Sequence, residues 1–170
     1  MNRILIEKSS WFKELEPEQK ALIHDGLQLL ELEIEALGSG SKKEQYYDYS
    51  FVLFPFSKAY EGFLKHYLYR LNLIDKETLE SRRFRIGRAI NPDVRKNQRD
   101  ENWFYEDIER LCGSHTARQL WDTWLVCRNR VFHYFPPKVK HLSITQAQDS
   151  VQLVIDSLRI AIECRIENEK

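Results

Sequence analysis

The chain has 170 residues, of which 42% are hydrophobic, 12% aromatic and 31% charged, and its 26 basic residues balance its 26 acidic ones. This length predicts one domain spanning residues 1–170, and the composition excludes a disordered chain, a collagen-like repeat and a disulfide scaffold. No apolar run approaches the roughly 20 residues that cross a bilayer, and the first residues lack a signal-peptide core. Cys112, Cys127 and Cys164 lack metal-ligand spacing, which indicates reduced thiols. We therefore expect a cytoplasmic protein that makes no contact with a membrane.

The first half of the chain predicts two long helices behind an N-terminal extension, residues 1–15. Pro17 suits a first helical position, and an apolar stripe at three- and four-residue steps follows until Gly38 ends it. Residues 38–41 predict a flexible connection. A second stripe runs from Phe56 to Ile74, and Pro55 either begins this helix or kinks it.

The second half predicts short helices and then two more long ones. Residues 75–110 form an irregular basic insertion, with breaks at 91–92 and around 97–102. A long helix is expected from near Ser114 to about Phe135, where two prolines end it. Ser143 and Gln146 form the capping box of a last helix. The chain is therefore predicted to be an all-α bundle of four to five main helices.

The charges are unevenly distributed along the chain. Residues 14–35 contain seven acids and one base, whereas residues 82–99 contain seven bases and one acid. The basic stretch is suited to holding a polyanion such as RNA, or it faces the acidic helix of the same chain or a partner protein. Its candidate RNA-binding residues are Arg82, Arg83, Arg85, Arg88, Arg95, Lys96 and Arg99.

An arginine falls on the apolar face of the predicted helix that ends at about Phe135. At about 100° per residue, Arg128 projects into the middle of a stripe formed by tryptophans and phenylalanines. A guanidinium stays charged in proteins, so it needs an acidic partner or a cleft open to a ligand. Two alternatives follow: Arg128 pairs with a structural glutamate, or it is held for a phosphate group.

Two further polar residues lie on the same predicted helix. Asn129 and His133 are four residues apart, and His133 falls in the last turn, where unpaired carbonyls favour its charged form. Such a histidine suits general acid or base catalysis. Arg128 and His133 project about 140° apart, so either the arginine curls round the helix or a second copy of the helix supplies the other residue.

The segment from Arg128 to His133 resembles the Arg-x4–6-His motif of the HEPN superfamily. Asn129 directly after the arginine matches the commonest form of the motif, and residues 59–65, with Glu61 and Lys65, resemble the second helix of RNase LS-type toxins. Chance predicts about 0.4 occurrences of Arg-x4-His in this composition, and a second one, Arg110 to His115, straddles Gly113 at a helix start. We interpret that second occurrence as a decoy.

The resemblance implies a metal-independent endoribonuclease, of toxin–antitoxin or phage-defence type, that needs no cofactor. The RNA 2′-OH would attack the adjacent phosphate at a homodimer cleft and leave a 2′,3′-cyclic phosphate. In such a site His133 is the general acid or base and Arg128 stabilises the phosphorane. Asn129 orients the scissile phosphate or the histidine, and Glu61 holds Arg128 in place or assists the histidine. Lys65 and Arg130 join the RNA-binding set. The expected partners are RNA, a second copy of the chain, and a cognate antitoxin or regulatory protein.

Other interpretations stay open at this point. The chain also suits a non-catalytic HEPN module for dimerisation or for binding nucleotides or proteins, or a helical adaptor in which Arg128 is structural. Glu61 and Lys65 alternatively form an exposed helix pair. Cys127, beside Arg128, is either a nucleophile or a small core residue. Tyr134 lies one residue earlier than the tyrosine that is modified in some HEPN toxins, which argues against that regulation.

Overall fold

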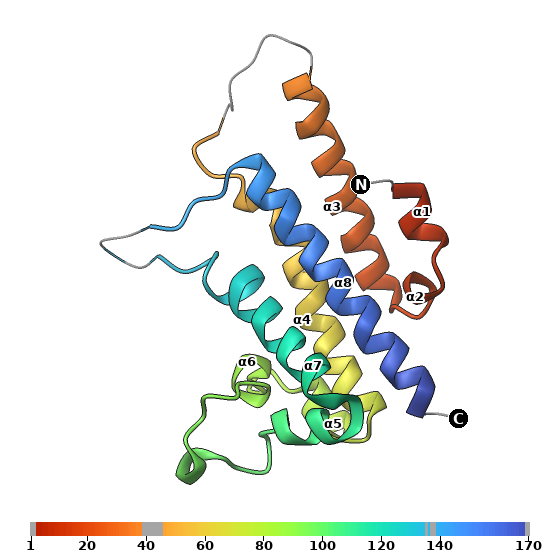
Figure 1. Cartoon of the computed structure of the whole chain (residues 1–170), viewed down its shortest axis with the longest axis vertical. Helices are drawn as coiled ribbons and strands as arrows, with labels where there is room; N and C mark the ends of the chain where they lie inside the picture. The colour runs from red at the N-terminus through yellow and green to blue at the C-terminus, as the bar shows by residue number, and fades with distance from the viewer. Residues whose placement is uncertain (1–2, 39–45, 135, 137–138, 169–170) are drawn as a thin grey trace.

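Four long helices carry the fold in a computed structural model that describes residues 3–38, 46–134, 136 and 139–168 (Figure 1). These ranges contain no strand, so the predicted all-α class is confirmed. Among the helices described, none is long and apolar enough to span a membrane. The long helices are α3 (Pro17–Gly38), α4 (Ser50–Arg70), α7 (Tyr105–Trp124) and α8 (Ile144–Asn168).

Helix α3 has the bounds that the sequence predicts. It begins at Pro17, and the Glu16 backbone N–H in front of it donates to the Gln19 side chain at 3.1 Å. Its buried stripe includes Ile23, Leu27 and Leu30 and packs along α4. The helix ends at Gly38, and residues 39–41 of the predicted connection lie outside the described residues.

Helix α4 begins earlier and ends earlier than its apolar stripe predicts. It starts at Ser50, so Pro55 lies inside the helix and the alternative in which Pro55 begins it is wrong. It ends at Arg70, before Ile74. The carboxylate of Asp48 holds the start of α4 near that of α8, because it accepts from the backbone N–H groups of Ser50 at 2.9 Å and Leu142 at 3.1 Å.

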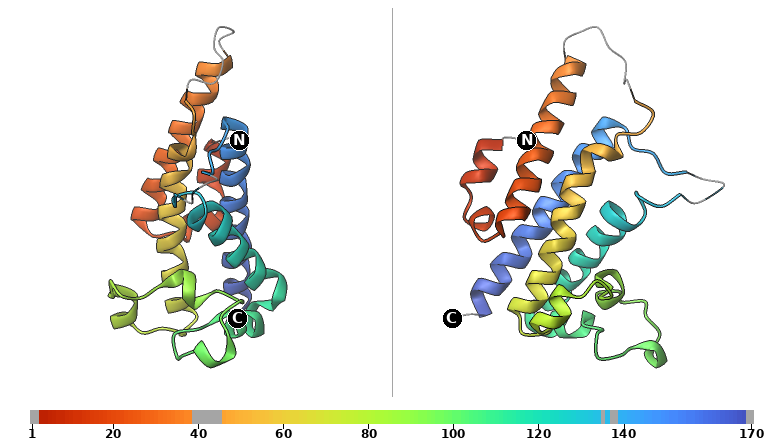
Figure 2. Two further views of the ribbon diagram at one scale, coloured as in Figure 1. Left: turned by 90° about the vertical axis from the view of Figure 1, so that its left-hand side faces the viewer. Right: turned by 180° about the vertical axis from the view of Figure 1, so that it is seen from behind.

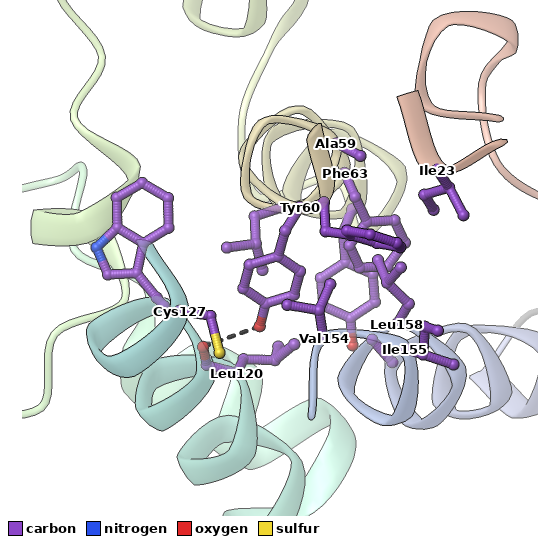
Figure 3. Close-up of a cluster of buried hydrophobic side chains, with 14 of the residues drawn as sticks. Ile23, Ala59, Tyr60, Phe63, Leu120, Cys127, Val154, Ile155 and Leu158 are labelled. Carbon is purple, nitrogen blue, oxygen red and sulfur yellow. Dashed lines mark hydrogen bonds between the residues drawn. The ribbon is translucent and has the colours of Figure 1, made fainter. Parts of the chain in front are cut away.

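The core lies where α4 packs against α3, α7 and α8. Figure 3 shows Tyr60 reaching from α4 towards the backbone of α7, and its hydroxyl donates to the Leu120 carbonyl at 2.9 Å. The Ser157 hydroxyl of α8 lies 2.8 Å from the same oxygen. Tyr60 is fully buried, and this burial raises the pKa of its phenol. One polar atom therefore joins three helices at the centre of the bundle.

Helix α7 differs most from its prediction. An additional helical segment begins at Tyr105, and α7 breaks at Gly113, whose positive φ of 81° suits glycine, so the predicted helix start near Ser114 is the start of the second half of α7. It ends at Trp124 and passes into a π-helical turn, η2 (Leu125–Asn129), so the prediction of a regular helix to about Phe135 is wrong. Phe135 itself lies outside the described residues. The helix from Ser143 is confirmed, since Ser143 and Gln146 exchange both capping-box hydrogen bonds.

The remaining helices are short. In the N-terminal extension, α1 (Arg3–Lys8) and α2 (Ser10–Lys13) lie beside α3, and Trp11, Phe12 and Leu15 are buried. The insertion contains α5 (Lys76–Glu80), α6 (Ile86–Ala89) and the 3₁₀ turn η1 (Lys96–Gln98), as its polar, broken pattern predicts. Figure 2 shows this green segment gathered at one end of the bundle, away from most of α3.

Two cysteines are paired, against the prediction of reduced thiols. A disulfide joins Cys112, at the end of the first half of α7, to Cys164 on α8, with Cα atoms 5.6 Å apart. Cys127 stays free and is buried. The prediction failed because the two residues are 52 positions apart, and only the packing of α7 on α8 brings them together.

Candidate functional site

A groove of about 390 Å³ opens between α4 and the π turn. Phe54 and Phe132 form its apolar wall, with ring centroids 5.6 Å apart in an edge-to-face contact. Its polar groups come from Ser57, Lys58 and Glu61 of α4 and from Arg128 of η2. The groove therefore gathers two cations and one acid beside exposed aromatic surface, a combination suited to an anionic ligand with an apolar part.

The guanidinium of Arg128 contacts Glu61 and Trp124. Its Nε donates to Glu61 Oε2 at 3.1 Å, and its Cζ lies 5.5 Å from the centroid of the Trp124 ring. About a third of each side chain of this pair is exposed. Among the residues that the structure describes, no acceptor lies within hydrogen-bonding distance of the two terminal nitrogens of Arg128. Arg128 therefore lies at the mouth of a groove and has donors to spare.

The Glu61 contact decides between two of the sequence-based alternatives. Glu61 and Lys65 are four residues apart on α4, but the carboxylate pairs with Arg128, and no ion pair between described residues includes Lys65. The helix-pair interpretation of Glu61 is therefore wrong, and its predicted contact with Arg128 is observed. Lys65 is half-buried on the same helix.

A π turn sets the position of Arg128. The backbone N–H of Arg130 donates to the Leu125 carbonyl at 3.0 Å, five residues back, and the Ser57 hydroxyl donates to the Cys127 carbonyl at 2.6 Å. Ser57 is buried, so it satisfies a carbonyl that the widened turn leaves open. The π turn therefore places Arg128 at the groove, beside Trp124 and Phe132 of the stripe that the sequence projects.

The structure corrects the expected positions of Asn129 and His133. Asn129 is half-buried as the last residue of the π turn, and His133 is exposed beyond it, so the two do not share the last turn of one regular helix. His133 is absent from the lining of the groove, although its neighbour Phe132 belongs to it. Within one protomer the structure therefore brings Glu61 to Arg128 but does not place the imidazole in the groove.

The basic insertion is packed beside this groove through one close approach. Gly87 of α6 faces the Trp124 indole, and a Cβ at Gly87 would lie 2.7 Å from Cε2 and 3.0 Å from Cζ2 of that ring. No larger residue fits this space. Trp124 also lies against Arg128, so its side chain contacts both α6 and the candidate site.

The seven basic residues of the stretch 82–99 fall into two groups. Arg88 pairs with Asp100 at 2.7 Å, and Arg99 pairs with Glu106 at 2.7 Å and lies 3.8 Å from the Trp103 ring centroid. These two arginines fold the insertion on itself. The others are exposed and form no ion pair with any described residue: Arg82, Arg83, Arg85, Arg95 and Lys96. Arg130 is likewise exposed.

The acidic helix is not the partner of this basic stretch. Three of the seven acids of residues 14–35 pair elsewhere: Glu14 with Arg165 at 2.5 Å, Glu16 with Arg70, and Glu31 with Arg3 at 3.6 Å. No ion pair between described residues joins α3 to residues 82–99. The exposed bases therefore face solvent and stay available to an anionic partner.

Two other candidates from the sequence, Cys127 and the second Arg-x4-His segment, are not part of the site. Burial raises the pKa of the Cys127 thiol to about 12, so this cysteine is protonated at neutral pH and the nucleophile interpretation is wrong. Arg110 and His115 of the second Arg-x4-His segment lie on either side of the break at Gly113. Arg110 pairs with Asp107 at 2.5 Å and both residues of the segment are exposed, so they provide matched controls.

Sequence reasoning missed Lys58, which adds a cation to the groove, and three further residues that act on the site. Ser57 donates a hydrogen bond to the π turn, Phe54 forms part of the groove wall, and Gly87 packs closely against Trp124. Only Ser57 carries a usable signal, since a serine amid apolar residues on one helix face predicts a buried hydrogen bond. The other two depend on elements far apart in sequence.

Comparisons with known proteins add no relative to this description. No protein-family model, no curated protein and no solved structure matches the chain.

Proposed function

We propose that the chain is a metal-independent endoribonuclease of toxin–antitoxin or phage-defence type whose Arg128 stabilises charge on the scissile phosphate. The observation that supports this most is the guanidinium at the groove, with about a third of the side chain exposed, fixed through Nε by Glu61 and with no described residue bonded to its terminal nitrogens. An arginine held in this way is preorganised for the equatorial oxygens of a phosphorane. The HEPN resemblance, carried by the segment from Arg128 to His133 and by residues 59–65, supplies the reaction class.

The proposed active site needs two protomers. His133 is exposed and lies outside the groove of its own chain, so the histidine that acts on the RNA 2′-OH comes from the partner copy. Phe54 and Tyr134 are 54% and 74% exposed, and such large aromatic side chains are what a dimer interface covers. Asn129, at the end of the π turn, orients the phosphate or the histidine.

The basic residues guide the RNA. Arg82, Arg95 and Lys96 are exposed without acidic partners among the described residues, and Lys58 adds a cation in the groove itself. Each phosphate contact of this kind releases counterions and makes affinity fall with salt. A cognate antitoxin or regulatory protein completes the biological setting that we propose.

Cleavage of a labelled RNA in excess EDTA, followed by analysis of the product termini, tests this function. Wild-type protein should leave 2′,3′-cyclic phosphate ends, and His133→Ala should abolish them, whereas His115→Ala should cleave normally. The alternative is a non-catalytic HEPN module for dimerisation or for nucleotide or protein binding, which the absence of His133 from the groove favours. Dimeric wild-type protein that binds RNA but never cleaves it would establish that alternative.

A further inference from the structure

A second cavity, of about 450 Å³, lies within the basic insertion and apart from the Arg128 groove. Its walls come from α5, from the segment between α5 and α6, and from the residues that follow η1. Arg83, Arg85 and Arg88 line it together with Ser81 and Thr78. Its volume falls within the range of roughly 300–1,000 Å³ typical of small-molecule sites.

The charges of this cavity are divided unequally. Arg88 is pinned, because its guanidinium donates to Asp100 Oδ2 at 2.7 Å and also to the Gln98 carbonyl, and this pairing lowers the pKa of the Asp100 carboxyl. Glu77 is the other acid in the lining. Arg83 and Arg85 are exposed and pair with no acid in the part of the chain that the structure describes. With Asp100 neutralising Arg88, two free guanidiniums outweigh one carboxylate.

We propose that this cavity binds phosphate groups through the guanidiniums of Arg83 and Arg85. Both arginines line the cavity and supply forked donors that match phosphate oxygens, and the Ser81 hydroxyl, which accepts from the Arg83 backbone N–H at 3.2 Å, adds a further donor in the same lining. The site goes beyond the proposed cleavage function, because Arg128 takes no part in it. The pinned Arg88 fixes the shape of the cavity rather than providing its free charge.

The position of the cavity links it to the groove. Arg85 and Arg88 flank Gly87, which packs on the Trp124 ring that also contacts Arg128. A phosphate held by Arg83 and Arg85 therefore lies just before α6 in the chain, and α6 packs on the ring beside the candidate active site. Two sources supply such a phosphate: the backbone of an RNA strand or a free nucleotide.

Calorimetric titration of the full chain with inorganic diphosphate tests the site. The double variant Arg83→Ala/Arg85→Ala should weaken diphosphate binding by about tenfold or more, because it removes both forked donors. The double variant Arg110→Ala/Arg118→Ala makes the same change in net charge on α7, away from the cavity, and should keep the affinity within about twofold. All four arginines are exposed, so thermal unfolding should report folded protein in each case.

Equal loss in both double variants, or wild-type protein that does not bind diphosphate, would overturn the proposal. Competition then assigns the source of the phosphate, with Arg128→Ala protein used so that no RNA is cut. Displacement of diphosphate by an RNA oligonucleotide identifies an RNA track, and displacement by a nucleoside diphosphate alone identifies a nucleotide site. Because none of these titrations measures cleavage, failure of the ribonuclease assignment leaves their result intact.

Discussion

Gly87 and Trp124 are packed so closely that only a hydrogen atom fits between the α6 backbone and the indole. The contact joins the basic insertion to Trp124, the last residue of α7. The same indole lies beside the guanidinium of Arg128 in the π turn that follows. Gly87 is therefore a positioning residue for the candidate site, although it is far from Arg128 in sequence.

Replacement of Gly87 by alanine should damage both stability and cleavage. The added methyl group overpacks the Trp124 contact, which costs about 1–3 kcal/mol in unfolding free energy, and it displaces the ring beside Arg128. Urea unfolding and RNA cleavage measured on the same preparations check this.

Two glycines of the long helices provide the controls for Gly87→Ala. A Cβ at Gly62 would lie 3.7 Å from Gln19, so Gly62→Ala should be tolerated, whereas Gly26→Ala presses on Phe56 and should destabilise without a specific effect on the site. If Gly87→Ala and Gly26→Ala lose cleavage only in proportion to stability, Gly87 has no positioning role.

Glu61→Gln should lower RNA cleavage by about tenfold, because the neutral amide holds the Arg128 Nε–H less tightly than the carboxylate does. The unfolding free energy should change by less than about 1 kcal/mol, since a third of each partner is exposed. Single-turnover rates and urea midpoints separate the two effects. A normal cleavage rate in folded Glu61→Ala protein would refute the role given to this carboxylate.

Removal of the disulfide should weaken the fold only in oxidising buffer. Cys164→Ser should lower the unfolding free energy by about 2–4 kcal/mol relative to oxidised wild type, because the bond closes a long loop between α7 and α8. In the presence of reductant the two proteins should unfold alike, which is the internal control. Equal stability of both proteins without reductant would show that Cys112 and Cys164 are not bonded in solution.

The buried thiol predicts a loss of stability at alkaline pH. The pKa of Cys127 is about 12 in the folded chain and near its ordinary value in the unfolded chain, so the unfolded state releases its proton first. Between about pH 9 and 10 the unfolding free energy should therefore fall by up to about 1.4 kcal/mol per pH unit from this group.

Cys127→Ala isolates this contribution, since the phenols of Tyr60 and Tyr67, whose pKa values burial also raises, remain in both proteins. Urea unfolding at several pH values should give a shallower pH dependence for the variant. Parallel curves for the two proteins would mean that the thiol is not buried as described.

The sequence predicts the regular parts of this fold because local signals determine them. Pro17 and the stripe behind it define α3, and Ser143 with Gln146 defines the start of α8. The end of α7 could not be predicted, because the π turn depends on a hydroxyl from Ser57, 70 residues away. That turn contains Arg128 and replaces the continuous helix predicted to about Phe135, and His133 lies beyond it.

Pairs of residues that are distant in sequence could not be predicted from local signals either. Glu61 and Arg128 are predicted to meet only through the family resemblance, and their contact needs α4 and η2 side by side. Cys112 and Cys164 have no local signal at all. Charge patterning identifies the insertion, but the division into pinned and free arginines depends on Asp100 and Glu106.

The rate of RNA cleavage by Arg128→Ala, measured in excess EDTA beside Arg110→Ala, tests the central claim most directly. Both variants remove one arginine of an Arg-x4-His segment, but only Arg128 lies in the groove. We predict that Arg128→Ala loses about 100-fold or more in rate while it stays folded, and that Arg110→Ala cleaves as wild type does. Folded Arg128→Ala protein that cleaves as fast as Arg110→Ala would contradict the account.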